Sequence, residues 1–265
     1  MSEGKFYSEA DLSSIETPDR KVREAIENLW TKEKDVIDRG YDSYLTLMEN
    51  GRIFDETGLD EYSFDGISEE RFDQILSQGK ILDVACGKGE FVKDCLRKKY
   101  DAYGIDLALT QEDAAKQINE SSPEIIGRIV AGDGTKLPFG DKSFKTIMNI
   151  FGVPSYLFDS EKVGDVLAEQ LRVLADDGCI IIHPISFRDN VPYPTNYVKK
   201  LAGDESGEFE KRGGEVSKAF AELISKLESD GEILVERHSD RDRLYEPGHL
   251  GGNGYIIIKK FSEKK

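Results

Sequence analysis

The sequence predicts an α/β protein whose mostly parallel sheet is covered by helices on both faces. Short apolar runs alternate with segments of helical periodicity from residue 80 onward, and this alternation is typical of a doubly wound fold. The last two apolar runs, 233–235 and 255–258, are joined by a turn-rich stretch without helical periodicity, which predicts an antiparallel pair. Upstream of residue 79 the pattern is helical and irregular, which predicts an N-terminal extension.

Residues 1–78 are expected to form this helical extension, which would act as a cap. Apolar residues recur at helical spacing across 22–37, and a shorter aromatic segment follows at 41–48. A stretch rich in Gly, Asp and Glu over 50–67 predicts a loop. It leads to a helix that begins after Ser68, because a serine at that position can cap the first turn.

Residues 79–265 are expected to form the sheet domain, with an insert near 184–214 that interrupts the alternation. The apolar runs that predict strands are 81–85, 102–105, 128–131, 144–150, 179–183, 233–235 and 255–258. The segments that predict helices between them are 91–96, 110–119, 163–174 and 219–227.

Composition excludes several classes of partner. The chain of 265 residues carries 36 Lys and Arg against 52 Asp and Glu, a net charge of −16 that repels a phosphate backbone and disfavours nucleic acid. It has no apolar run of membrane-spanning length and no apolar N-terminal signal, so we expect a cytoplasmic protein without a membrane partner. Cys86, Cys95 and Cys179 lack metal-ligand spacing, which predicts reduced thiols and no metal site. The sequence carries no signal for an oligomeric state.

A glycine turn after the first predicted strand is the strongest indication of a ligand site. Gly87 and Gly89 let a ligand approach the backbone closely, because glycine has no side chain and tolerates unusual dihedral angles. Asp106 ends the next strand, where a carboxylate can accept two hydrogen bonds from a ribose diol. Dinucleotides and S-adenosylmethionine both bind to such turns. The third glycine of a dinucleotide turn would fall on Val92, which disfavours a nicotinamide oxidoreductase.

The turn and three later segments resemble the motifs of class I methyltransferases, in order. Residues 83–89 (DVACGKG) resemble motif I, acid-x-Gly-x-Gly-x-Gly, with Ala85 at the first glycine position. Residues 103–107 (YGIDL) are similar to the end of the family's second strand. Residues 132–144 and 149–152 resemble the segments after its third strand and at the end of its fourth. The resemblance covers roughly residues 80 to 184.

This resemblance implies a Rossmann-like fold with seven strands, the last one antiparallel, and S-adenosylmethionine as the cofactor. In it Asp106 would bind the ribose, Asp133 would face the adenine amino group, and Asn149 would lie near the methionine end. Asp83 either touches the ligand or holds the turn. The residues implied as cofactor-binding are Asp83, Ala85, Gly87, Gly89, Asp106, Leu107, Asp133, Gly134 and Asn149.

The implied function is methyl transfer from S-adenosylmethionine to a small-molecule acceptor. Residues 149–152 read NIFG rather than the tetrad of enzymes that methylate base amino groups. His183, at the end of the fifth strand, is the candidate catalytic residue because histidine exchanges a proton near neutral pH, and packing is its other interpretation. His238 and His249 are expected at the surface. The alternative is a regulatory protein that binds the cofactor without turnover.

Overall fold

The protein contains one seven-stranded sheet with strand order β3-β2-β1-β4-β5-β7-β6. The structure is a computed structural model that describes residues 40–50, 66–110, 116, 118, 122–150, 152, 157, 159–186, 208–238 and 253–261. The strands are β1 Ile81–Val84, β2 Ala102–Asp106, β3 Ile129–Ala131, β4 Phe144–Ile150, β5 Leu174–Ser186, β6 Ile233–His238 and β7 Asn253–Lys260. The α-helices are α3 Tyr41–Asn50, α4 Glu69–Leu76, α5 Glu90–Arg97, α7 Val163–Val173 and α9 Glu208–Ser229. Short 3-10 turns are η2 Leu107–Thr110, η3 Pro123–Ile125 and η4 Ser160–Lys162.

The strand directions confirm the predicted fold class. Strands β1 to β5 pair in parallel, while β7 runs antiparallel to both of its neighbours, β5 and β6. The chain moves outward from β1 to β2 and β3 on one side, and to β4 and β5 on the other. The strand order therefore reverses between β1 and β4, and ligands of open α/β sheets bind at the carboxyl end of such a reversal.

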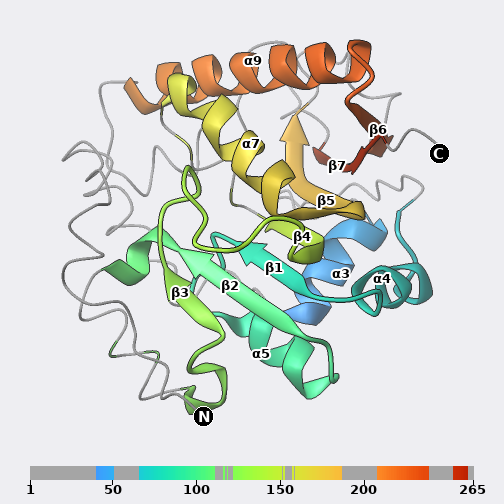
Figure 1. Cartoon of the computed structure of the whole chain (residues 1–265), viewed down its shortest axis with the longest axis vertical. Coiled ribbons are helices and arrows are strands. Elements are labelled where there is room, and N and C mark those ends of the chain that lie inside the picture. The colour runs from blue at the N-terminus through green and yellow to red at the C-terminus, as the bar shows by residue number, and fades with distance from the viewer. Residues whose placement is uncertain are drawn as a thin grey trace, which may run out of the picture.

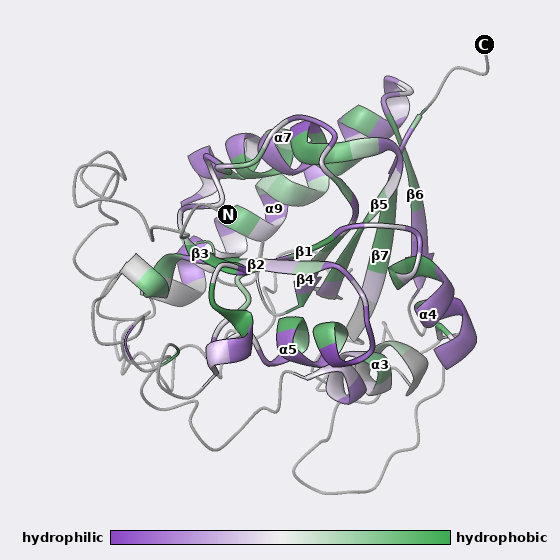
Figure 2. Cartoon of the chain, turned by 60° about the horizontal axis from the view of Figure 1, so that its bottom comes forward, coloured by the Kyte–Doolittle hydropathy of each residue, from purple (hydrophilic) through white to green (hydrophobic). Residues whose placement is uncertain are grey.

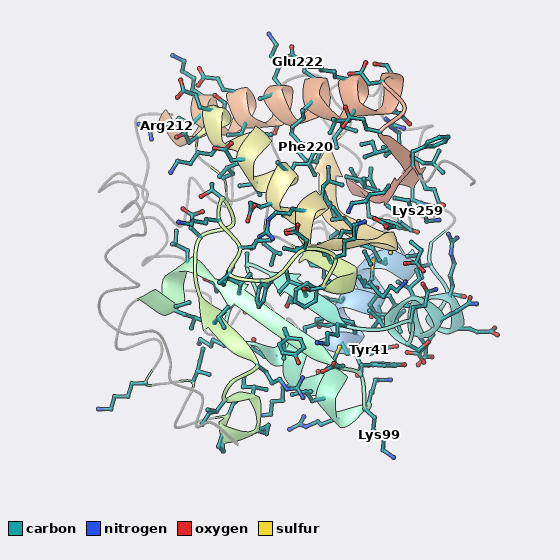
Figure 3. The ribbon with its side chains drawn as sticks, viewed as in Figure 1. Tyr41, Lys99, Arg212, Phe220, Glu222 and Lys259 are labelled. Atoms are coloured by element: carbon teal, nitrogen blue, oxygen red, sulfur yellow. The ribbon has the colours of Figure 1, made fainter. Side chains whose placement is uncertain are left out.

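Helices cover both faces of the sheet, as Figure 1 shows. Helices α3, α4 and α5 pack on one face and α7 and α9 on the other, each layer with its own buried apolar cluster. Figure 2 shows strands β5 and β7 hydrophobic over most of their length, as expected for strands buried on both faces. In Figure 3 Phe220 lies on the side of α9 that faces the sheet, and Glu222 points away.

The described part of the N-terminal extension shares the core of the sheet domain. Tyr41 and Tyr44 of α3 are each 1% exposed and belong to the same apolar cluster as Phe91 of α5. The hydroxyl groups of Tyr41 and Tyr100 both donate to the Asp73 carboxylate, the latter over 2.8 Å. These bonds lower the pKa of Asp73 despite the opposing effect of its partial burial. They tie α3 to α4 and to the chain that enters β2.

Several predicted boundaries are confirmed. Ser68 caps α4 by accepting a hydrogen bond from the Arg71 amide over 3.2 Å. The strand predicted over 144–150 is β4, with the same bounds. The predicted helix over 22–37, most of the loop over 50–67 and most of the insert near 184–214 lie outside the described residues.

Strand β5 begins earlier than the sequence predicts. Helix α7 ends at Val173 and β5 begins at Leu174, which pairs with Phe144 before the register shifts so that Thr146 pairs with Cys179. Gly178 lies inside this irregularity, where a Cβ atom would stand 2.7 Å from the Lys145 carbonyl oxygen. Glycine marks a close backbone approach here rather than the end of a helix.

Among the helices that the structure describes, none combines the length and the apolar character needed to cross a membrane.

Candidate functional site

The turn after β1 has the backbone shape that favours glycine. Ala85, Gly87 and Gly89 have φ angles of 61°, 57° and 80°, in the left-handed region where a side chain is strained. A Cβ atom at Gly89 would lie 2.0 Å from Cδ1 of Ile129, so the space there excludes any side chain. Helix α5 begins directly after Gly89, so that its first amide groups lie beside the turn.

Asp106, the last residue of β2, is hydrogen-bonded to this turn. Its Oδ2 accepts a hydrogen bond from the Gly87 amide over 2.8 Å. The neighbouring Ala85 amide donates to the Ile105 carbonyl oxygen over 2.8 Å, which holds the end of β1 against the end of β2. The structure therefore brings together the two features that the sequence singled out, a glycine turn and a carboxylate at the end of the next strand.

Close packing of α5 on β2 depends on a glycine that the sequence analysis did not single out. A Cβ atom on Gly104 would lie 2.6 Å from Sγ of Cys86 and 3.2 Å from Val92. In dinucleotide folds the third glycine of the turn permits the close approach of helix and strand. Here the helix position carries Val92, fully buried, and the strand carries the glycine.

Asp133 and Gly134 follow β3 in a tight turn. The Asp133 side chain accepts a hydrogen bond from the Thr135 amide over 2.8 Å, which is the bond of an Asx turn. The Gly132 amide donates to the Asp106 carbonyl oxygen over 3.2 Å, so this loop leaves the sheet beside the end of β2. Leu107 starts the η2 turn at the same place. The adenine-side candidates thus lie next to the ribose candidate.

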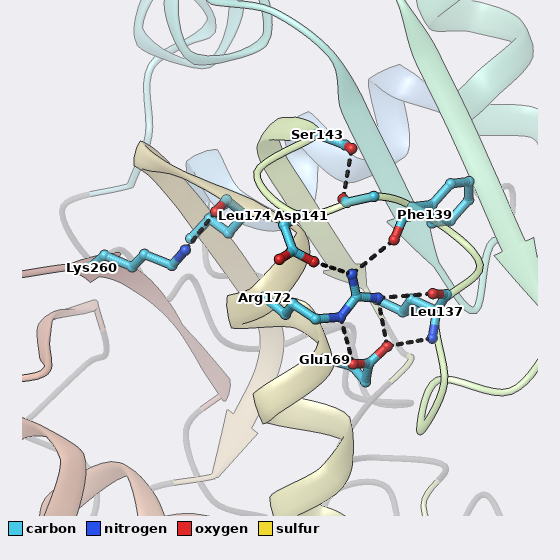
Figure 4. Close-up of polar contacts among 9 residues, drawn as sticks. Leu137, Phe139, Asp141, Ser143, Glu169, Arg172, Leu174 and Lys260 are labelled. Atoms are coloured by element: carbon cyan, nitrogen blue, oxygen red, sulfur yellow. Dashed lines mark hydrogen bonds and ion pairs between the residues drawn. The ribbon is translucent and has the colours of Figure 1, made fainter.

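The loop after β3 is anchored to α7 by Arg172, as Figure 4 shows. The guanidinium group donates to the carbonyl oxygens of Leu137 and Phe139, each over 2.9 Å. It also forms ion pairs of 2.7 Å with Glu169 and Asp141. Glu169 in turn accepts the Leu137 amide over 2.8 Å. The hydrogen bonds from Arg172 lower the pKa of Glu169, and those to Glu169 and Asp141 raise the pKa of Arg172.

Asp83 lies beneath the turn on the face covered by α3. It is fully buried, and its Oδ2 is 3.4 Å from the hydroxyl of Tyr44. The Tyr44 ring stacks on Phe91, with 4.5 Å between ring centres. The sequence left open whether Asp83 touches the ligand or holds the turn, and it did not indicate Tyr44, which lies 39 residues away.

The cysteines are free and buried, which confirms the prediction of reduced thiols. Burial, and then the nearby carboxylates of Asp106 and Asp83, raise the pKa of Cys86, so its thiol stays protonated and packs as a small apolar group. Burial likewise raises the pKa of Cys179 to about 11. In the part of the chain that the structure describes, no three His, Cys, Asp or Glu side chains are grouped to hold a metal ion.

Asn149 and Gly152 lie where β4 ends beside β1. The Asn149 side chain is fully buried, and its Nδ2 donates to Oε1 of Gln170 on α7 over 2.7 Å. A Cβ atom on Gly152 would lie 2.8 Å from the Val84 carbonyl oxygen, 3.1 Å from Cβ of Ala85 and 3.4 Å from Oδ1 of Asn149. The backbone at Gly152 therefore packs against the end of β1 too closely to accept a side chain. Gln170 is a further residue that the sequence analysis missed.

His183 is 1% exposed and pairs in register with Ile150, the last residue of β4. It therefore lies near the carboxyl edge of the sheet. His238 reaches the same edge, because β6 pairs with β7 and its ring stacks on Tyr255 with 4.5 Å between ring centres. His238, which was expected at the surface, is partly exposed, with 18% of its side chain accessible. His249 lies outside the described residues.

The family comparison decides between the cofactors that such a turn could bind. Residues 81–178 match the model of a methyltransferase domain. This segment is a class I methyltransferase domain. The glycine turn, Asp106, the loop after β3 and Asn149 all lie within it. The family and the fold imply S-adenosylmethionine as the cofactor of this methyltransferase domain.

Curated relatives match part of the chain. A demethylmenaquinone methyltransferase from Renibacterium salmoninarum is 30% identical over 122 residues, which are 46% of this chain and 48% of the relative. One from Staphylococcus epidermidis is 32% identical over 108 residues, or 38% of this chain and 41% of the relative. The chain therefore matches about half of the length of these relatives or less. A solved SAM-dependent methyltransferase from Methanosarcina mazei is 17% identical, with a TM-score of 0.49, and the match covers 72% of this chain and 97% of that one.

The residues at the carboxyl edge fit S-adenosylmethionine chemically. Gly87 and Gly89 give the turn its left-handed backbone, and the Asp106 carboxylate offers an acceptor for hydroxyl groups. At the other side of the β1 end, Oδ1 of Asn149 lies 3.4 Å from the point where a Cβ atom would stand on Gly152. This buried oxygen has no hydrogen-bond donor among the described residues. A ligand with a donor group at one end and a ribose at the other matches this arrangement.

Proposed function

We propose that this protein transfers a methyl group from S-adenosylmethionine to a small-molecule acceptor. The observation that carries the proposal is the hydrogen bond of 2.8 Å between the Gly87 amide and the Asp106 carboxylate, inside a methyltransferase domain. It fixes a glycine turn and a carboxylate side by side at the edge where open α/β sheets bind ligands.

We assign the cofactor residues along this edge from one end of the ligand to the other. Asp106 would accept hydrogen bonds from the ribose, and Gly87 and Gly89 would let the ligand lie against the backbone. Asp133 and Gly134, which adjoin β2 through the Gly132 amide, would lie beside the adenine. Leu107 would pack near the same base and Asn149 near the methionine end.

The remaining assigned positions would support the turn. Asp83 is buried below it within reach of the Tyr44 hydroxyl, so we propose that it holds the turn rather than touching the ligand. Ala85 would contact the methionine end through its backbone, where most of the family has glycine.

When bound, S-adenosylmethionine supplies an electrophilic methyl group. The chain would hold the acceptor in line with that group and exclude water from it. His183, near the end of β5, is proposed to accept a proton from an acceptor hydroxyl or amine as the new bond forms. Helix α3 of the extension lies below the glycine turn, where Tyr44 contacts Asp83. We propose that the extension and the insert near 184–214 close over the acceptor.

A small molecule is the acceptor class that the chain supports best. The net charge of −16 opposes binding of nucleic acid, and residues 149–152 lack the tetrad used for base amino groups. The curated relatives are named for demethylmenaquinone, a small molecule, and their matches cover 46% and 38% of this chain.

The test is transfer of a labelled methyl group from S-adenosylmethionine into cell extract separated into low-molecular-weight, protein and nucleic-acid fractions. We expect label in the low-molecular-weight fraction, and little with the Asp106→Ala variant. Label in a macromolecular fraction alone would overturn the acceptor class. Binding of S-adenosylhomocysteine without transfer into any fraction would replace the enzyme by the non-catalytic alternative.

A further inference from the structure

A buried pair of side-chain amides links the end of β4 to α7. Asn149 is 0% exposed and Gln170 is 1% exposed, and Nδ2 of Asn149 donates to Oε1 of Gln170 over 2.7 Å. An amide group has its oxygen and nitrogen on opposite sides of one carbon. Because the nitrogen of Asn149 is held toward α7, its oxygen must face away from α7.

That oxygen lies in a site that calls for a donor. Oδ1 of Asn149 is buried and has no hydrogen-bond partner among the described residues. Leaving a buried acceptor unsatisfied costs about 1–3 kcal/mol, so such an atom in a ligand-binding region points to a donor on the ligand.

The surroundings of the oxygen define the group that it can bind. One point, the Cβ position of Gly152, lies 3.4 Å from Oδ1 of Asn149 and 2.8 Å from the Val84 carbonyl oxygen. Both acceptor oxygens therefore lie beside the Gly152 backbone, where the strand order reverses between β1 and β4. Acceptor oxygens suit a donor or a cation and repel a carboxylate.

We propose that Gln170 is a positioning residue that turns the Asn149 oxygen toward the α-ammonium group of S-adenosylmethionine. This inference rests on the proposed function, because it assigns one end of the cofactor to one end of the site. Gln170 acts through Asn149. Without Oε1 of Gln170, the Asn149 amide can rotate and present its own nitrogen, which is a donor, to the ammonium group of the cofactor.

Calorimetry with two probes tests the proposal. S-adenosylhomocysteine carries the amino-acid end, and 5′-methylthioadenosine keeps the adenosine and the sulfur but lacks that end. The Gln170→Met variant fills a similar volume and loses the acceptor. We expect it to bind S-adenosylhomocysteine about tenfold more weakly, with unchanged affinity for 5′-methylthioadenosine. Gln74→Met, an exposed change on α4, is the matched control and should alter neither affinity.

Two more variants test whether Gln170 acts through Asn149. In an Asn149→Ala background, Gln170→Met should cause no further loss of S-adenosylhomocysteine affinity. Asn149→Asp should keep most of that affinity, because the Gln170 amide can turn to donate to the new carboxylate, which still presents an oxygen to the ammonium group.

Equal weakening of both probes in Gln170→Met would show a general packing effect and overturn the proposal, as would unchanged binding of both. Failure of the proposed function looks different: either the unmodified protein binds neither probe, or it binds S-adenosylhomocysteine but transfers no labelled methyl group. Thermal melting of each variant identifies loss of folding separately from loss of binding.

Discussion

Ala85 has a φ angle of 61°, in the left-handed region that costs a residue with a side chain about 1–2 kcal/mol. Replacing it by glycine should relieve this strain, although the unfolded chain gains entropy. We expect Ala85→Gly to raise the free energy of unfolding by about 0.5 kcal/mol in urea denaturation. The control Ala219→Gly, inside α9, should lower it by about 1 kcal/mol. Equal losses in the two variants would contradict a strained turn.

Asp106 has two roles in this account, and two substitutions separate them. Asp106→Asn keeps an oxygen that can accept the Gly87 amide and loses the charge, whereas Asp106→Ala loses both. We expect Asp106→Ala to weaken binding of S-adenosylhomocysteine by about 2 kcal/mol, and to weaken 5′-methylthioadenosine as well because both contain the ribose. Asp106→Asn should weaken the binding of each ligand by less than Asp106→Ala does. The Asp106→Asn variant should have the same melting temperature as the unmodified protein. Unchanged affinity in folded Asp106→Ala would show that Asp106 is not the ribose ligand.

Among single residues, the sequence indicates those candidates that directly follow a predicted strand. The Gly87 turn and Asp106 are recognisable because each directly follows an apolar run. Tyr44 and Gln170 are not, since their partners Asp83 and Asn149 are 39 and 21 residues away and only the fold brings them together. The stacking of His238 on Tyr255 is not recognisable either, because Tyr255 comes from another strand.

Helix α7 and the loop after β3 are joined by Arg172, whose planar guanidinium group contacts four partners at once. Arg172→Ala should lower the free energy of unfolding by about 2–4 kcal/mol, because two carbonyl oxygens and a partly buried carboxylate lose their donor. Arg172→Lys should lower the free energy of unfolding by an intermediate amount, since an ammonium group cannot donate to all the partners of the planar guanidinium group at once. The control Lys142→Ala removes a single exposed ion pair with Asp176. It should change the free energy of unfolding by less than about 0.5 kcal/mol. Equal effects of Arg172→Ala and Lys142→Ala in urea denaturation would contradict the claim that Arg172 holds the loop after β3 on α7.

Glu169 makes this anchor sensitive to acid. The hydrogen bond from Arg172 lowers the pKa of Glu169 below its usual value of 4.5. A carboxyl group with a lowered pKa in the fold contributes its full stability above the unfolded pKa and loses it as the pH falls through the folded pKa. The free energy of unfolding should therefore fall below about pH 4.5, and fall less steeply in Glu169→Gln. Glu222→Gln, exposed on α9, should keep the original slope. An unchanged slope in Glu169→Gln would refute the assignment.

Element positions were predictable where periodicity and capping agree, as at β4 and at the start of α4. The boundary of α7 and β5 was not, because the strand was predicted over 179–183, directly after Gly178. The chain uses that glycine in an irregular strand pairing, where it passes close to the Lys145 carbonyl oxygen. Local turn signals cannot distinguish a helix end from a strand irregularity, since glycine suits both.

For the whole molecule, the alternating pattern sufficed to predict the sheet and its antiparallel end. The order of the strands in the sheet was not predicted, because pairing between distant strands leaves no local signal. The described part of the extension packs into the same core as α5, so the proposed division at residue 78 is one of sequence pattern rather than of separate cores. The extension therefore reaches the cofactor turn from below, through Tyr44.

The central claim is that the carboxyl edge between β2, β1 and β4 binds S-adenosylmethionine. Isothermal titration calorimetry of the unmodified protein with S-adenosylmethionine, S-adenosylhomocysteine and NAD tests it most directly. We predict saturable binding of the first two and no binding of NAD, because buried Val92 stands where a dinucleotide turn has its third glycine. Micromolar binding of NAD without binding of S-adenosylmethionine would contradict the account.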